Sequence, residues 1–152
     1  QLELAHDLDL PVIIHMREAT EATLSMLREA HKDGLLSKDH PSGVVHCYSG
    51  SAETIPVLLE LGFMIGFDGP ITYKNARKPL EALATVPIES LVLETDAPYL
   101  TPHPHRGKRN EPSYLPFIGE KAAEVLNMNI RDVAAQTTAN ALRLFRMEQS
   151  SM

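Results

Sequence analysis

Two histidines and two carboxylates close short apolar runs, and these residue types could bind a divalent metal ion. His15 ends "PVIIH", His46 lies in "GVVHC", and Glu94 and Asp96 follow in "LVLETD". Imidazole and carboxylate suit zinc, manganese, iron or nickel, and magnesium only with further oxygen ligands. Each residue alone is more often a hydrogen-bonded residue at a strand end or a cap. Recurrence at three such ends favours a metal site with His15, His46 and Asp96 as ligands.

A basic, proline-rich loop comes directly after this acidic pair. It contains Arg106, Lys108 and Arg109, and arginine offers paired donors that match the oxygens of a phosphate. The alternative is a solvated loop whose cations pair with Glu111. The neighbouring metal ligands favour phosphate binding.

Several nearby side chains could also meet a substrate, although each has a plain structural alternative. Arg17 follows His15 by two residues and could contact a phosphate or lie at a helix start. His105 could donate to a phosphate or a leaving group. Tyr48 could stack on a base. Cys47 alternates away from His46, so we expect it to face a helix layer as a small buried residue rather than act as a nucleophile.

The elements that must position these residues alternate along the chain. Strands are predicted over 11–15, 43–47, 63–67 and 91–94, with helices from about 18 to 32, 52 to 61 and 75 to 84, and two more over 113–127 and 130–145. This order predicts an α/β fold with a parallel sheet covered by helices. The carboxyl ends of parallel strands share one edge, so the candidate ligands should converge there. Period-two alternation also places Val92, Glu94 and Asp96 on one face.

Composition limits the class of protein. The chain has 152 residues, of which 43% are hydrophobic and 22% charged, as in one globular domain. It contains no apolar run near ~18 residues and no basic-then-apolar leader, so we expect a cytoplasmic protein with no membrane partner. With one cysteine, it cannot form an internal disulfide or a multi-thiolate metal site. A net charge of −6 opposes broad capture of nucleic acid but leaves room for a local basic cluster.

Five segments together resemble one known family. In chain order they are "PVIIHMREA", "VVHCYSGS", "GFDGPITYKNA", "LVLETDAPYLTPHPHRGKRNEP" and "AAQTTANALRLF". They are similar to the motifs of the TatD-type metal-dependent deoxyribonucleases of the amidohydrolase superfamily. The resemblance implies a TIM-type (β/α)8 barrel, of which this chain would supply strands five to eight. Residues 1–152 would then be the C-terminal half of a single barrel domain, and the absent half would carry a His-x-His pair and a bridging Glu.

The resemblance also implies an activity, hydrolysis of DNA phosphodiester bonds from an end of the strand. His15 and His46 would bind one metal ion, and Asp96 would bind a second and act as general base. The two ions, magnesium, manganese or zinc, would lower the pKa of a bound water. Glu94 would organise the nearby cations. The residues expected to contact DNA are Arg17, His105, Arg106, Lys108 and Arg109.

Two other interpretations stay open. Related barrels hydrolyse small amides, esters or lactones, and for these the basic loop would have no phosphate to bind. Alternatively, the chain alone is an inactive half-barrel whose exposed strand edges cause self-association. In the nuclease interpretation, the partners of this chain would be DNA and the missing N-terminal half of the barrel.

Overall fold

The computed structural model describes residues 1–147 and has the predicted alternation of strands and helices. The strands are β1 (Val12–His15), β2 (Gly43–His46), β3 (Phe63–Phe67) and β4 (Leu91–Leu93). The helices are α1 (Leu2–Asp7), α2 (Thr20–Lys32), α3 (Ile55–Glu60), α4 (Arg77–Leu83), α5 (Leu115–Leu126) and α6 (Ile130–Phe145). Short 3-10 segments cover Ala52–Thr54, Gly69–Thr72, Ile88–Ser90 and Pro112–Tyr114.

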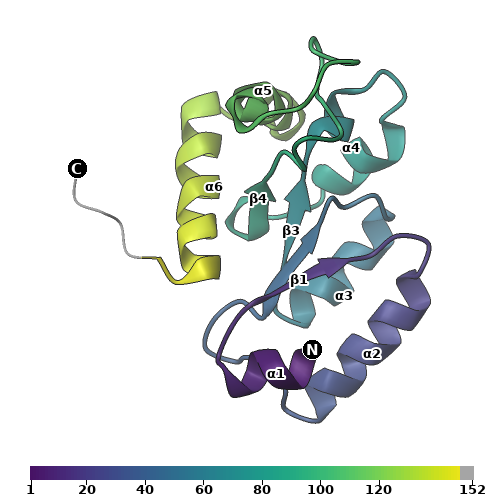
Figure 1. Ribbon diagram of the computed structural model, residues 1–152, viewed down its shortest axis with the longest axis vertical. Coiled ribbons are helices and arrows are strands. Elements are labelled where there is room, and N and C mark those ends of the chain that lie inside the picture. The colour runs from purple at the N-terminus through teal and green to yellow at the C-terminus, as the bar shows by residue number, and fades with distance from the viewer. Residues whose placement is uncertain (148–152) are drawn as a thin grey trace.

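The strands form one parallel sheet in chain order, β1-β2-β3-β4. Each crossover contains a helix, and α2, α3 and α4 lie along the same side of the sheet (Figure 1). The predicted α/β class is therefore confirmed. Because all the strand pairs are parallel, the carboxyl ends of all the strands lie at one edge of the sheet.

The two faces of the sheet have different cores. Val45, Ile65 and Leu91 belong to the main core, which includes buried residues of α2, α3, α4 and α5. On the other face, Val44, Met64 and Val92 form a smaller cluster with Leu144 of α6. This second face also carries the side chains of His15 and His46, because the strand register pairs His15 with His46 two residues beyond the pair Ile13 and Val44.

Helix α2 shows how the sequence pattern specifies this packing. Its buried residues Leu24, Leu27 and Ala30 recur every three positions and form an apolar stripe toward the sheet. Helix α6 begins at an Asn129 cap whose side chain accepts a hydrogen bond from the Arg131 amide at 2.8 Å. Local capping and helical periodicity thus explain why the predicted and observed helices agree closely.

Apolar surface remains uncovered at both sides of the sheet. Ile13 of β1 is 63% exposed on the face that carries His15. Beside β4, a groove of about 390 Å³ runs between α5 and α6, with apolar lining that includes Leu93, Leu115, Ile130 and Phe145. Within residues 1–147, β1 and β4 each have one strand neighbour, so each leaves one edge open.

A three-residue clasp joins the two ends of the described chain away from the candidate site. Arg146, just after α6, donates to the carboxylate of Asp9, and His40 Nε2 lies 3.1 Å from the other oxygen of Asp9. The Arg146 hydrogen bond is the main cause that lowers the pKa of Asp9. We refer to Asp9, His40 and Arg146 as the clasp.

None of the helices described in residues 1–147 combines the length and apolar character needed to cross a membrane.

Candidate metal centre

The ring nitrogens of His15 and His46 face each other at the carboxyl ends of β1 and β2. Nδ1 of His15 lies 2.9 Å from Nε2 of His46, and the residues are direct partners in the parallel register. Two imidazole ligands at ~2.0–2.1 Å from one zinc ion lie about 2.9–3.4 Å apart, depending on the bond angle. The observed separation fits a shared divalent ion with only a small outward movement of either ring. The pair therefore offers two nitrogen ligands to one ion.

Glu94 holds His46 from the other side of its ring. Its carboxylate lies 3.5 Å from Nδ1 of His46 and accepts a short hydrogen bond from the backbone amide of Cys47. A carboxylate on the outer nitrogen of a ligand histidine fixes the tautomer and the ring orientation. Burial raises the pKa of the Glu94 carboxyl, and the Cys47 amide and His46 oppose that rise. Glu94 was expected to organise the nearby cations, and its observed partners are His46 and the Cys47 amide.

Gly66 on β3 leaves the space that this carboxylate occupies. A Cβ at Gly66 would lie 3.2 Å from the Glu94 carboxyl carbon, so an added methyl group would press directly on the carboxylate. Gly69, just after β3, comes still closer to its neighbour, since a Cβ there would lie 1.7 Å from the carbonyl oxygen of Leu100. These contacts show a close backbone approach at this edge of the sheet.

Asp96 lines the same cavity as the two histidines. The cavity has a volume of about 490 Å³, and its lining includes His15, Arg17, His46, Asp96 and Tyr99. Asp96 is not the end of a strand stripe, however, because β4 ends at Leu93 and Asp96 adopts a left-handed backbone with φ of 54°. The alternation of side chains between the two faces of the sheet therefore ends with β4 at Leu93. The turn itself directs the side chain of Asp96.

The described part of the chain does not complete a three-ligand metal site. Among residues 1–147, no three His, Cys, Asp or Glu side chains are gathered closely enough to hold an ion. His15 and His46 meet, whereas Asp96 shares their cavity without joining them. Completing a coordination shell requires further ligands or a movement of Asp96.

Asn110 fastens the turn that carries Asp96 to the end of the basic loop. Its buried amide donates to the carbonyl oxygens of Thr95 and Tyr99, each at 2.5 Å, and its side-chain oxygen accepts from the Glu111 amide at 2.9 Å. The Asn110 backbone amide also donates to the oxygen of Pro98. No local motif in the sequence indicates this role, since the bonds span up to 15 residues.

The predicted substrate contacts occupy two different places. Arg17 lines the cavity with His15. The loop residues His105, Arg106, Lys108 and Arg109 are absent from that lining. Arg106 lies over the Tyr73 ring at 3.8 Å, and His105 stacks on Tyr114 with a centroid distance of 4.3 Å. The sequence prediction treated these residues as one group, and the structure separates Arg17 from the rest.

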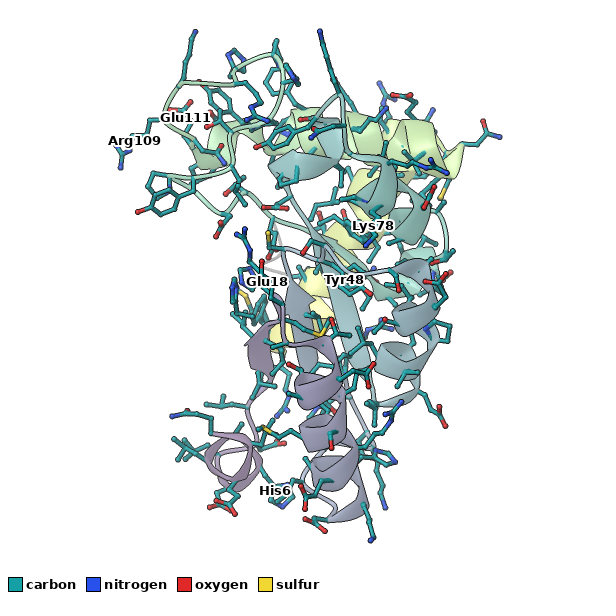
Figure 2. All side chains as sticks on the ribbon, turned by 90° about the vertical axis from the view of Figure 1, so that its right-hand side faces the viewer. His6, Glu18, Tyr48, Lys78, Arg109 and Glu111 are labelled. Carbon is teal, nitrogen blue, oxygen red and sulfur yellow. The ribbon has the colours of Figure 1, made fainter. Side chains whose placement is uncertain are left out.

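The loop cations are not neutralised by neighbouring carboxylates. Arg109 projects outward at the edge of the molecule near Glu111 (Figure 2). In residues 1–147 no ion pair within 4.0 Å joins Arg106, Lys108 or Arg109 to an acidic group, and Glu111 instead accepts a short hydrogen bond from Ser113. The alternative of a loop internally paired with Glu111 is therefore not what the structure shows.

Two expectations about residues 47 and 48 are wrong. Cys47 adopts a left-handed backbone with φ of 48° just past β2, which ends the alternation, so it lines the cavity instead of facing the helix layer. Burial raises the pKa of its thiol, which disfavours a nucleophilic thiolate. Tyr48 is only 3% exposed, and it packs edge-on against Phe67. Its ring cannot stack on a base.

Asp68 is a buried carboxylate that the sequence analysis did not single out. It follows β3 directly, is 2% exposed, and has one oxygen without a hydrogen-bond partner among the described residues. Burial raises its pKa to about 7, and the nearby Glu94 and Asp96 add to the rise. Its place at a strand end was a usable signal, because the other three strands supplied candidates by the same rule.

The structure is thus an α/β protein with imidazole and carboxylate groups at the carboxyl ends of its parallel strands. The family model of the TatD related DNases matches residues 1–146. The chain therefore belongs to the TatD family.

Individual relatives agree with this assignment. The chain is 44% identical over 147 residues to YabD of Bacillus subtilis (strain 168), named an uncharacterized metal-dependent hydrolase, covering 97% of this chain and 55% of YabD. It is 37% identical over 150 residues to a protein of Pantoea ananatis named 3'-5' ssDNA/RNA exonuclease TatD, covering 95% of this chain and 55% of that protein. The crystal structure of the Escherichia coli TatD homologue YJJV superposes with a TM-score of 0.85 at 31% identity, covering 97% of this chain and 54% of that one. The chain thus spans about half the length of these relatives.

Proposed function

We propose that this chain provides part of the active site of a metal-dependent hydrolase that cleaves DNA phosphodiester bonds from an end of the strand. The observation that carries the proposal is the 2.9 Å approach of His15 Nδ1 to His46 Nε2 at the edge where the strands end. The name of the Pantoea ananatis relative supports the nuclease activity.

Each residue of the site has a role that follows from its position. His15 and His46 would hold the ion, and Glu94, by occupying the Nδ1 side of His46, would keep its Nε2 free for it. A divalent ion bound there would supply Lewis-acid activation of water and of the phosphate, and the family resemblance implies two such ions. Asp96, on the same cavity wall, accepts the proton of the attacking water. Arg17 offers a cation to the phosphate inside the cavity.

The loop cations act further along the strand. Because Arg106, Lys108 and Arg109 lie outside the cavity lining and have no carboxylate partner in residues 1–147, they bind phosphates that are not being cleaved. His105, fixed by its stack on Tyr114, belongs to the same surface.

The test is hydrolysis of single-stranded DNA by the full-length protein with magnesium, manganese or zinc. We expect His15→Ala and His46→Ala each to abolish cleavage and bound metal, measured by elemental analysis. His31→Ala, an exposed histidine of α2, serves as the matched control and should keep both. Full cleavage by both variants that lack a ligand would overturn the proposal.

An acyl hydrolase is the second candidate, and one observation favours it. The loop cations do not line the cavity, so the cavity by itself does not demand a phosphate. A panel of small amides, esters and lactones should be tested beside DNA. Reversal of Arg106 and Arg109 to Glu should impair only a nuclease. If acyl substrates are turned over and DNA is not, the second candidate replaces the first.

We further propose that residues 1–152 form the C-terminal half of a (β/α)8 barrel. The open edges of β1 and β4, the exposed Ile13 and the apolar groove beside Leu93 are the surfaces that four more strands and their helices would cover. Mixing this chain with the half of YabD that it does not match should give a one-to-one complex by native mass spectrometry. If this chain remains a stable monomer and forms no complex with that half, the proposal is contradicted.

A further inference from the structure

Tyr99 is a large aromatic side chain that the fold leaves in solvent. It is 71% exposed, the highest value among the exposed large hydrophobic residues within 1–147. Burying an aromatic side chain gains free energy, so a ring kept outside on a fixed turn calls for an explanation. Its position gives one, because Tyr99 forms part of the cavity that contains His15, His46 and Asp96.

The turn that presents Tyr99 is fixed at both its ends. The Tyr99 amide donates to the carbonyl oxygen of Asp96 at 2.9 Å, and the Tyr99 carbonyl accepts from the buried amide of Asn110 at 2.5 Å. The ring is therefore exposed on an ordered backbone. A preordered contact surface loses less entropy when a ligand binds to it.

The other three tyrosines of the chain already have aromatic or cationic partners. Tyr48 packs edge-on against Phe67, Tyr73 lies under the Arg106 guanidinium at 3.8 Å, and Tyr114 stacks on His105 at 4.3 Å. Among residues 1–147, no aromatic ring or cation is paired with Tyr99 in this way. Tyr99 is thus the tyrosine whose ring faces remain available to a ligand.

We propose that Tyr99 stacks on a nucleobase of the strand being cleaved. The inference rests on the proposed nuclease function and assigns a base-binding residue to its cavity. A cavity of about 490 Å³ falls in the size range of small-ligand sites, and Leu100 and Pro70 add apolar lining to it. Ring stacking accepts any base, because each base has a π face. A base inside a duplex is already stacked on its neighbours, so single strands and frayed ends are favoured.

The test compares Tyr99→Ala, Tyr99→Phe and Met26→Ala in the full-length protein. Met26 is an exposed apolar residue on α2 and serves as the control. The substrates are single-stranded oligothymidylate and the same oligonucleotide with an abasic terminal residue. Tyr99→Ala should raise KM on the normal strand by about 5- to 150-fold, equivalent to ~1–3 kcal/mol, and leave KM on the abasic strand nearly unchanged. Tyr99→Phe and Met26→Ala should behave as the parent protein.

Equal loss on both oligonucleotides, or a Tyr99→Phe variant as impaired as Tyr99→Ala, would overturn the stacking proposal. Binding of a labelled oligothymidylate with a chelator present, followed by fluorescence anisotropy, separates this inference from the proposed function. A protein that cleaves no DNA but loses binding with Tyr99→Ala would refute the nuclease and keep the stacking site. If Tyr99→Ala cleaves DNA as well as the parent protein does, the nuclease proposal stands and the stacking proposal is refuted.

Discussion

Glu94 and His46 form a carboxylate–imidazole pair in which the carboxylate lies 3.5 Å from Nδ1, opposite the nitrogen that faces His15. This arrangement sets which nitrogen of His46 is free to bind an ion. It also couples the end of β4 to the end of β2, because the same carboxylate accepts the Cys47 amide.

Replacing Glu94 by Gln should weaken metal binding without unfolding the protein. We expect affinity for zinc or manganese to fall about 10- to 100-fold, because the amide cannot replace the carboxylate as a charged acceptor for the imidazole. Isothermal titration measures the change. Glu120→Gln, an exposed glutamate of α5, is the control and should have no effect. Unchanged affinity in Glu94→Gln would show that the pair does not orient the ligand.

Removing single loop cations should change the salt dependence of DNA binding. For Arg106→Gln, Lys108→Gln and Arg109→Gln, the slope of log affinity against log salt should fall by ~0.7 for each lost contact to a single strand. Arg131→Gln, on the exposed first turn of α6, should keep the parent slope. Anisotropy titrations over a range of sodium chloride concentrations give the slopes. If all the variants keep the parent slope of log affinity against log salt concentration, DNA does not contact this loop.

Asn110→Ala should destabilise the protein by about 1–3 kcal/mol, since it removes buried hydrogen bonds and leaves the carbonyls of Thr95 and Tyr99 without this donor. Urea unfolding measures the change in free energy. Asn75→Ala, at an exposed position before α4, should lie close to the parent value. Equal stability of the two variants would mean that Asn110 does not hold the turn.

The buried carboxyl of Asp68 should make stability depend on pH in the metal-free protein. Its pKa is raised to about 7 from 3.8, so the folded state binds more protons than the unfolded state between these values. The stabilisation is complete below the unfolded pKa and is lost as the pH rises through about 7. The charged or titratable groups that act on Asp68 are Cys47, Tyr73, Glu94 and Asp96.

At ~1.4 kcal/mol for each pKa unit, the effect amounts to at most about 4 kcal/mol. Asp68→Asn should therefore flatten the fall in unfolding free energy from acid to neutral pH, and it should be the more stable form at alkaline pH. Urea unfolding across this range with a chelator present measures both curves. Coinciding curves for the two proteins would refute the assignment to Asp68.

Local pattern predicted the order of the strands and of helices α2 to α6, with bounds that lie within three residues of the observed ones. β3 was predicted and observed over 63–67, and α6 over 130–145. The pairing of His15 with His46 also followed from strand ends in a parallel sheet. Such features depend on periodicity and capping, which are readable in one segment at a time.

The parts of the site that could not be predicted depend on contacts between distant segments. Asn110 reaches back 15 residues to Thr95, and Glu94 reaches 47 residues to the Cys47 amide. Left-handed backbone at Cys47 and Asp96 ended the alternation on which their predicted directions relied. Only the three-dimensional structure brings these groups together.

The clasp between Asp9 and Arg146 closes a loop of 137 residues and so has a kinetic consequence. So distant a contact can form only after residues 9 to 146 have all left the ribosome, and closing so long a loop is slow relative to forming neighbouring βα units. We therefore expect the clasp to form late in folding. A contact that forms after the folding transition state mainly lowers the unfolding rate and has little effect on the folding rate.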